Sequence, residues 1–301
     1  MKIAVIGGTG LIGPYLLPRL INSGHVVTCL NRRGTSSCSS AVSCDRRDGN
    51  RLRAVLKDLE PQVVIDMVPY TKEDAEILCD VLDSGPEIQV IAISSIDVYQ
   101  AYGRLHHTEP GDYQKCPIKE EDALRQQLSF QGEDYDKLNV EKTYRLHFEN
   151  LSILRMPAIY GWPDQFRVKQ YYDAVSKENR TLRMNPEFAK WGFTRASAQD
   201  CALATSLSIG QLGHHVYNVG EEELLSEEEW CLLVWEACGR NGKILYDKDA
   251  PIPFDADLKQ GWHVDTTKIR SELGYSEESN RIEILRDTIQ KMQETEDAIT
   301  S

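Results

Sequence analysis

No stretch of the sequence approaches the roughly 20 consecutive apolar residues that a membrane-spanning helix needs. Internal repeats and low-complexity linkers are also absent. None of the eight cysteines forms a C-x-x-C pair or stands at zinc spacing with a histidine. We therefore expect free thiols, no metal site and no membrane contact, as in a cytoplasmic protein.

Positive charge is scarce relative to negative charge, with 34 Lys and Arg against 47 Asp and Glu and a net charge of -13. An acidic surface repels phosphate backbones, so non-specific nucleic-acid binding is excluded. The 301 residues are 41% hydrophobic, which suffices for a full-sized core in one large or two medium domains.

Short apolar runs alternate with longer amphipathic ones in the first half of the chain. The pattern predicts buried parallel strands joined by helices, as in a doubly wound α/β sheet of the Rossmann type. Pro18 conflicts with this pattern, because it falls inside the first predicted helix and should kink it or remove a bond. The strands are expected at residues 2–7, 25–30, 62–68, 89–95 and 151–157.

The pattern loosens after Gly161, so we expect a Rossmann-type domain over 1–160 and a smaller α/β substrate-binding lobe over 161–301. A strand at 215–220 is expected to return to the first domain. Ser226 precedes Glu229 by three residues, the spacing of a capping box at a helix start.

The segment "GGTGLIG" places Gly7, Gly10 and Gly13 directly after a predicted strand and at the start of a helix. Glycines in this context allow a tight turn and a close approach of the backbone to a pyrophosphate, which rests on the helix N-terminus. The position of the motif predicts a dinucleotide site and disfavours an ordinary glycine-rich turn.

The end of the second predicted strand indicates which dinucleotide is bound. Sites that prefer NAD usually carry a carboxylate there, whereas this chain has Asn31, Arg32 and Arg33. Two guanidinium groups suit a 2′-phosphate, so NADP is favoured, and NAD remains open if the arginines belong to a solvated loop. Asp45 and Asp48 follow a short predicted strand, where a carboxylate could accept the adenine amino group or be ordinary surface charge.

With "CDRRD", "VIDMVPY", "ISSIDVY", "LRMPAIYG" and "FTRASAQDCALA" following the glycine motif in order, the chain resembles the extended short-chain dehydrogenase/reductase superfamily. It is closest to an atypical branch of the NAD-dependent epimerase/dehydratase type. The resemblance implies an NAD(P)-binding protein that acts on a hydroxyl of a sugar or nucleotide sugar. It also implies a homodimer formed through the helices at 71–84 and 135–149.

The resemblance also implies roles for individual residues. Ser95 matches the catalytic Ser or Thr of the superfamily, and Asp45 and Arg46 are expected near adenine. The remaining residues implied to contact the cofactor are Gly7, Thr9, Gly10, Leu11, Ile12, Gly13, Met67, Val68, Pro69, Ile93, Lys137, Met156, Pro157 and Ala158.

The Tyr-x-x-x-Lys motif of the superfamily is missing, because "GEDYDKLNVEK" offers Tyr135 and Lys137 only two residues apart. Val140, Tyr144 and Phe148 form an apolar stripe in register with Lys137, so the lysine should face the cofactor. Within a helix Tyr135 would then lie about 200° away and point elsewhere.

Three interpretations of this segment remain open. Lys137 keeps its place without a tyrosine, or Tyr135 and Lys137 form a rearranged catalytic pair. The third is a surface ladder of Glu133, Lys137 and Glu141. Other phenols near predicted strand ends could replace the missing one, namely Tyr70, Tyr99, Tyr102 and Tyr160.

Residues of the later loops are candidates for substrate contact. His107, with its neighbour His106, follows the Ser95 strand in a loop that could cover the substrate. Arg195 is the best candidate to meet an anionic substrate group, because a buried arginine needs a partner. Tyr99, Trp162 and Trp191 complete the predicted pocket, although tryptophans more often pack in a core.

Two classes of function follow. The first is an NADP-dependent oxidoreductase or epimerase with an atypical active site, whose partner is a small molecule. The alternative is a non-catalytic NADP(H)-binding sensor or scaffold, suggested by the missing tyrosine position. An RNA-binding role is disfavoured by the net charge of -13 and the lack of a basic stripe.

Overall fold

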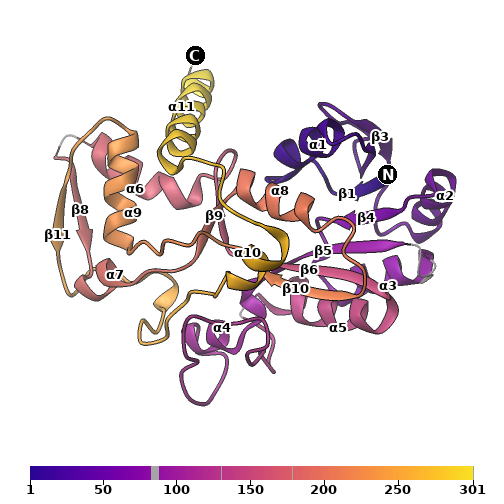
Figure 1. The fold of residues 1–301 in the computed structure, drawn as a ribbon. Helices are drawn as coiled ribbons and strands as arrows, with labels where there is room; N and C mark the ends of the chain where they lie inside the picture. Colours follow the sequence, from indigo (N-terminus) through magenta and orange to yellow (C-terminus); the bar gives the residue numbers. More distant parts are fainter. Residues whose placement is uncertain (83–87, 130, 178, 301) are drawn as a thin grey trace.

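A computed structural model describes residues 1–82, 88–129, 131–177 and 179–300 (Figure 1). The end of the predicted 71–84 helix therefore lies outside the described residues. None of the helices within these ranges is long and apolar enough to cross a membrane.

Seven parallel strands form the central sheet in the order β10-β6-β5-β4-β1-β2-β3. The central strands are almost entirely buried, as their continuous apolar sequences predict. The strands are β1 (Lys2–Ile6), β2 (Val26–Asn31), β3 (Ser40–Ser43), β4 (Val63–Asp66), β5 (Gln89–Ser95), β6 (Asn150–Met156) and β10 (His214–Asn218).

Helices cover both faces of this sheet, so the predicted doubly wound α/β fold is confirmed (Figure 1). One face packs against α1 (Gly13–Asn22) and α8 (Ala198–Leu207). The other face packs against α2 (Gly49–Leu59), α3 (Lys72–Val81) and α5 (Lys137–His147).

The strand order changes direction between β1 and β4. From β1 the chain builds outward to β2 and β3 on one side, and from β4 to β5 and β6 on the other. Ligands of open α/β sheets bind in the crevice at the carboxyl ends of the strands beside this change of direction. The fold therefore places the glycine motif after β1 and residues 67–69 after β4 at one binding crevice.

Residues from the second half of the chain form a separate lobe, on the left of Figure 1, with its own aromatic core around Trp230 and Trp235. The predicted Ser226–Glu229 capping box is present at the start of α9. The lobe contains α6 (Phe166–Ser176), β8 (Thr181–Met184), α7 (Pro186–Lys190), α9 (Glu227–Ala237), β11 (Lys243–Tyr246) and α11 (Arg281–Thr300).

Short elements connect the lobe with the main sheet and border the space between them. Strands β7 (Ala158–Tyr160) and β9 (Arg195–Ser197) pair with each other. The remaining elements are the 3-10 turns η1 (Ile96–Val98), η2 (Gly132–Asp134) and η3 (Pro253–Asp255) and the helices α4 (Gln100–Leu105) and α10 (Thr267–Leu273).

Helix α1 continues through Pro18, which removes one helical hydrogen bond, as expected, without ending the helix. The structure differs from the sequence expectations in two local features. Strand β3 lies in a polar segment expected to be mostly loop, where pairing with β2 supplies its backbone bonds. Helix α5 begins at Lys137 instead of residue 135.

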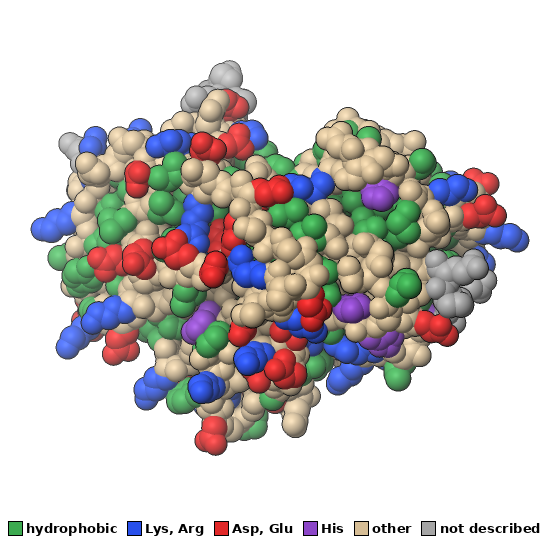
Figure 2. All heavy atoms as spheres, viewed as in Figure 1, with side chains coloured by type: hydrophobic (Ala, Val, Ile, Leu, Met, Phe, Trp, Pro, Cys, Tyr) green, Lys and Arg blue, Asp and Glu red, His purple; other side chains and the backbone are tan. Residues whose placement is uncertain are grey.

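The surface carries acidic and basic side chains side by side. Figure 2 shows Lys and Arg interspersed with Asp and Glu over the face in view, without a continuous basic stripe there. All eight cysteines are free thiols, as predicted.

Candidate functional site

A cavity of about 210 Å³ lies at the carboxyl ends of β1, β4 and β5, where the fold predicts a ligand. We call it the cofactor pocket. Its lining residues are Gly7, Gly10, Leu11, Ile12, Gly13, Met67, Val68, Tyr70, Ile93, Ser94, Ser95, Tyr135, Lys137, Met156, Pro157 and Ile159.

The three motif glycines serve this pocket in different ways. Gly7 has φ +82°, and a Cβ there would lie 2.6 Å from Val68. A Cβ on Gly13 would lie 1.9 Å from the carbonyl oxygen of Gly8, so this glycine lets the chain pack on itself. A Cβ on Gly10 would meet no atom nearer than 4.0 Å, which leaves room for a ligand against the backbone.

The start of α1 completes a site for an anionic ligand. No side chain caps this helix, whose N-cap residue is Ile12. Pro14 has no N–H and that of Tyr15 bonds the carbonyl of Ile12, so the N–H of Gly13 is the one in the first turn without a partner among the described residues. Helix N-termini attract phosphate through these groups and through the helix dipole. Together with the open space at Gly10, the residues present fit the pyrophosphate of a dinucleotide.

Most of the residues expected to contact the cofactor come together here. Ala158 lines the larger neighbouring cavity. Thr9 is exposed and lines neither of the two cavities. Pro69 contributes its carbonyl oxygen to Lys137. The expected residues that line the pocket are Gly7, Gly10, Leu11, Ile12, Gly13, Met67, Val68, Ile93, Lys137, Met156 and Pro157.

The end of β2 presents two unpaired cations. Asn31 is buried and shapes the turn, because its Oδ1 accepts a hydrogen bond from the backbone of Arg33 at 3.0 Å and its Nδ2 donates one to the carbonyl of Thr35 at 2.8 Å. Arg32 and Arg33 are exposed, and neither guanidinium group has a partner among the described residues.

Arg46, which is expected near adenine, is hydrogen-bonded to a buried carboxylate and to a backbone carbonyl. Its guanidinium group donates hydrogen bonds at 2.7 Å to the carboxylate of Asp66 and to the carbonyl of Asp74. Asp66 is fully buried and also accepts a hydrogen bond from Tyr144 at 2.6 Å. Arg46 therefore neutralises a buried carboxylate, and Asp45 beside it accepts a hydrogen bond from the backbone of Arg47.

Lys137 is the first residue of α5 and lies buried in the cofactor pocket, facing it as the apolar stripe predicts. Its ammonium group donates hydrogen bonds at 3.0 Å to the carbonyls of Pro69 and Ile93, and it lies 4.7 Å from the centre of the Tyr70 ring. Burial lowers the pKa of Lys137 to about 8, against the opposing effects of Asp66 and Asp97.

The alternative of a surface ladder is wrong, because Glu141 is as buried as Lys137. Both oxygens of Glu141 accept hydrogen bonds from Arg155, and one also accepts a hydrogen bond at 2.6 Å from Ser94. Glu133 lies before the helix, in η2.

Tyr135 does not point away from the site as a helical position would require. It lies before the first turn of α5, with φ -145° and ψ 86°, and its side chain lines the cofactor pocket and the larger cavity. The centre of its ring is 5.5 Å from the ammonium group of Lys137. Burial raises the pKa of Tyr135 far above its ordinary value, and Asp97 adds to this, while a hydrogen bond with Ser95 opposes it.

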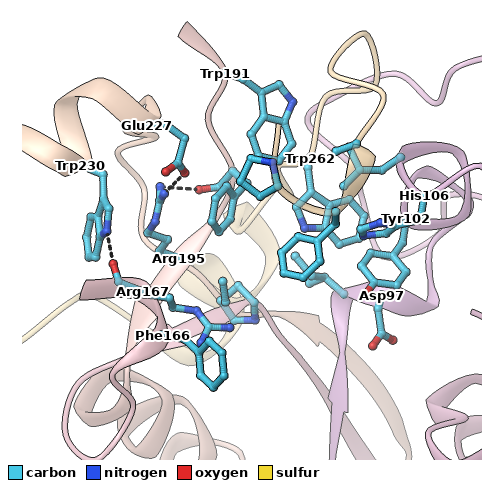
Figure 3. A pocket seen from close by; sticks show the side chains of 18 of the residues that line it. Asp97, Tyr102, His106, Phe166, Arg167, Trp191, Arg195, Glu227, Trp230 and Trp262 are labelled. Atoms are coloured by element: carbon cyan, nitrogen blue, oxygen red, sulfur yellow. Dashed lines mark hydrogen bonds and ion pairs between the residues drawn. The ribbon is translucent and has the colours of Figure 1, made fainter. Parts of the chain in front are cut away.

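A second cavity of about 670 Å³ adjoins the cofactor pocket at Ser95, Tyr135 and Pro157, and we call it the substrate cavity (Figure 3). Aromatic side chains dominate its walls. They are Tyr102, His106, Tyr135, Phe166, Tyr171, Phe188, Trp191, Phe193, Trp230, Phe254 and Trp262.

Arg195 lines this cavity, but its expected anionic partner comes from the protein itself. The buried guanidinium group forms an ion pair with Glu227, which also accepts a hydrogen bond from Tyr171. Phe193 and Trp230 stack on it, with ring centres 3.9 and 4.6 Å from its Cζ. Figure 3 shows this pair on the opposite side of the cavity from Asp97 and Tyr102.

Three of the expected substrate residues lie elsewhere. Tyr99 is fully buried and is hydrogen-bonded to Asn218 at 2.6 Å and to Arg155 at 2.8 Å. His107 is exposed and donates to the carbonyl of Asp255 at 3.1 Å, while Trp162 packs against the core of the lobe.

Other candidates from the same segments do line a cavity. His106, the neighbour of His107, lines the substrate cavity, and burial lowers its pKa to about 4, so it is neutral at pH 7. Tyr102 and Trp191 line it as well. Among the other replacement phenols, Tyr70 lines the cofactor pocket, whereas buried Tyr160 donates a hydrogen bond to Glu221 at 2.6 Å.

The sequence reasoning missed Asp97, a carboxylate that lines the substrate cavity two residues after β5. Its side chain is 4% exposed, and Oδ1 has no hydrogen-bond partner among the described residues. Burial raises the pKa of Asp97 to about 6, although Arg125 and Lys137 oppose this. The available signal was a carboxylate just beyond the carboxyl end of a predicted strand.

Residues 3–109 match the model of the NAD dependent epimerase/dehydratase family. This match supports the expected resemblance to the extended short-chain dehydrogenase/reductase superfamily over residues 3–109. No curated protein matches the sequence.

Solved structures with the same fold extend the comparison to the whole chain. UDP-glucose 4-epimerase from Thermotoga maritima with UDP-glucose is 16% identical, with a TM-score of 0.74, and the match covers 98% of this chain and 99% of that one. The enzyme of that name from Bifidobacterium longum, in complex with NAD+ and UDP, is 17% identical, with a TM-score of 0.74 and 98% coverage of both chains.

A dehydratase has the fold as well. dTDP-glucose 4,6-dehydratase from Bacillus anthracis in complex with NAD is 17% identical, with a TM-score of 0.73, and the match covers 99% of this chain and 98% of that one. At such identities the likeness establishes the fold, and the chemistry has to be argued from the residues of this chain.

Proposed function

We propose that this protein is an enzyme that uses a nicotinamide dinucleotide to oxidise or reduce a hydroxyl-bearing carbon of a sugar or nucleotide sugar. The observation that carries the proposal is the junction of the two cavities. Ser95 and Tyr135 line both of them, and Lys137 lines the cofactor pocket. A cofactor in one cavity and a hydroxyl compound in the other would meet at these side chains.

The residues at the junction have distinct tasks in this proposal. A nicotinamide dinucleotide supplies reversible hydride transfer to or from a carbinol carbon. Ser95 forms a hydrogen bond with the substrate oxygen, and Lys137 would supply a positive charge to the part of the cofactor bound in this pocket. Tyr135 and Lys137 lack the four-residue spacing of Tyr-x-x-x-Lys. Tyr135 can still line the pocket beside Lys137 because it precedes the helix.

NADP is the proposed cofactor. Arg32 and Arg33 are exposed and without partners among the described residues at the end of β2, where a 2′-phosphate would need cations. The similar structures from Bifidobacterium longum and Bacillus anthracis contain NAD. The proposed preference of this chain for NADP therefore rests on its own residues.

Substitution of Ser95 and Lys137 tests the proposal. Absorbance at 340 nm would follow turnover of UDP-glucose, glucose and 1-phenylethanol with NADP+ or NAD+. Ser95→Ala and Lys137→Ala should each lower kcat/KM by about 100-fold, the lower end of what proton-transfer and orienting groups contribute. The matched controls are Ser271→Ala and Lys142→Ala, two exposed positions outside the site. Unchanged turnover in both site variants would refute the assignment.

The alternative function is that of a non-catalytic NADP(H) sensor. It is favoured by the raised pKa of Tyr135, which keeps the phenol from acting as the usual base of the superfamily. Tight NADPH binding without turnover of any substrate in the panel would establish this alternative. A homodimer through α3 and α5 is also proposed, since Leu146 on α5 is 90% exposed.

A further inference from the structure

Asp97 is buried without full hydrogen bonding, an arrangement that a carboxylate with a purely structural role does not need. It lies in η1, immediately after β5, with 4% of its side chain exposed. Oδ1 lacks a hydrogen-bond partner among the described residues, although buried carboxylates are normally fully bonded. Such an arrangement costs stability, and it leaves one oxygen of the carboxylate able to accept a proton.

Ser95 links this carboxylate to the junction of the cavities. Its Oγ accepts a hydrogen bond from the backbone N–H of Asp97 at 3.2 Å, and its hydroxyl lies close enough to the carboxylate of Asp97 and to the phenol of Tyr135 to lower the pKa of each. Because Ser95 lines both cavities, its hydroxyl is the part of this chain of groups that a substrate oxygen can reach.

The groups that face Asp97 come from several elements. Arg125 donates from Nε to the backbone carbonyl of Asp97 at 2.5 Å, and its Nη2 has no partner among the described residues. Lys137 and Glu141 approach from α5, and the phenols of Tyr102 and Tyr135 complete the surroundings. The two cations keep the carboxylate ionised near neutral pH in spite of its burial.

We propose that Asp97 is the terminal proton acceptor of this site and receives, through the Ser95 hydroxyl, the proton that the substrate hydroxyl loses. The inference rests on the proposed function. The O–H bond of the substrate breaks and a new O–H bond forms on Ser95, as the original Ser95 proton passes to the Asp97 carboxylate. The electron pair left on the substrate oxygen completes the carbonyl as the carbinol carbon gives up its hydride, which the oxidised nicotinamide of the proposed function would accept. In the reverse direction, neutral Asp97 returns the proton.

Tyr135 is less suited to this task. A proton acceptor has to be deprotonated at the working pH. Burial and the neighbouring Asp97 raise the pKa of Tyr135 far above its ordinary value, so the phenol stays neutral. Tyr135 then orients the substrate oxygen by donating a hydrogen bond and does not remove the proton.

Kinetics of matched variants separate the two residues. With NADP+ and the alcohol panel above, Asp97→Asn should lower kcat by about 100-fold or more, the usual contribution of a general base. NADPH affinity, measured by its fluorescence, should change less than about twofold, and Asp97→Glu should recover part of kcat. Tyr135→Phe should lower kcat by less than about tenfold, and exposed Asp58→Asn should leave it unchanged.

The pH profile adds a readout that loss of packing would not mimic. Oxidation should rise with pH through about 6, where Asp97 loses its proton, and Asp97→Asn should lack this limb. A profile that keeps the limb in Asp97→Asn, or a Tyr135→Phe loss larger than the Asp97→Asn loss, would overturn the proposal and leave the proposed function intact. Absence of turnover in the unaltered protein would refute the proposed function, and this inference with it.

Thermal unfolding supplies a readout that is independent of activity. The folded-state pKa of Asp97 is raised above its ordinary value of 3.8 to about 6, so the folded protein holds this proton more tightly than the unfolded chain. Stability contributed by the group is present below about pH 4 and is lost as the pH rises to about 6. As the pH rises from about 4 to about 6, the Tm of Asp97→Asn should therefore increase relative to the Tm of the unaltered protein. A relative loss would identify an ordinary structural aspartate and overturn the proposal.

Discussion

The cofactor pocket and the substrate cavity share Ser95 and Tyr135 but are built by different means. The cofactor pocket is formed largely by backbone, at glycines and at the ends of neighbouring strands of one sheet. The substrate cavity is formed by side chains of residues between Ser95 and Trp262 in the sequence, which come from both lobes. One is fixed by local geometry and the other by the packing of distant segments.

This difference determines how each half should respond to substitution. A backbone cradle is damaged by any added atom, while the surrounding fold keeps its own contacts. A wall of buried, mutually paired side chains is damaged by removing one partner, because the other then stays buried and unsatisfied. Binding and stability should therefore separate where the cofactor pocket leaves open space, as at Gly10, and change together in the substrate cavity.

The largest effect is expected from Glu227→Ala in the substrate cavity. The substitution leaves Arg195 as a buried cation without its carboxylate and removes the acceptor of Tyr171. Breaking a buried ion pair in this way costs about 3–5 kcal/mol of unfolding free energy. Chemical denaturation would measure it. Glu236→Ala, at an exposed position of the same helix, is the control and should cost less than about 0.5 kcal/mol. Equal losses of unfolding free energy in the two variants would show that the Arg195–Glu227 pair does not stabilise the cavity.

A smaller effect, confined to binding, is expected from Gly10→Val in the cofactor pocket. The added side chain would occupy open space, with no atom of the protein within 4 Å of its Cβ except the carbonyl oxygen of Gly7. Stability should change by less than about 0.5 kcal/mol. NADPH should bind at least about tenfold more weakly, because the pyrophosphate loses its close approach to the backbone. Fluorescence titration and denaturation on the same samples would check both.

Gly13→Ala provides the contrast within the same motif. Its Cβ would lie 1.9 Å from the carbonyl oxygen of Gly8, so the chain has to shift, at a cost of about 1–3 kcal/mol. If Gly10→Val destabilised the protein as much as Gly13→Ala, the open space at Gly10 would have to serve the fold and not a ligand.

The same contrast explains what the sequence could predict. The strands, the order of helices and the glycine motif depend on short-range periodicity, and they were predicted to within two or three residues at most boundaries. Asp97 and the Arg195–Glu227 pair depend on contacts between distant segments, which periodicity does not report. The direction of Tyr135 was misjudged for a local reason, since the helical rule was applied two residues before the helix begins at Lys137, ahead of the N-cap at Asp136.

The smallest effect is expected just beyond the carboxyl end of β2, from Arg32→Ala and Arg33→Ala. Both side chains are exposed and unpaired among the described residues, so neither substitution should change stability by more than about 0.5 kcal/mol. Each exposed cation contributes about 1 kcal/mol to a partner phosphate at low salt, so each variant should bind NADPH about fivefold more weakly. NADH affinity should stay constant, because NADH lacks the 2′-phosphate. Exposed Lys57→Ala is the control. Equal affinity of the unaltered protein for NADPH and NADH would mean that these arginines read no phosphate, and that the preference for NADP is wrong.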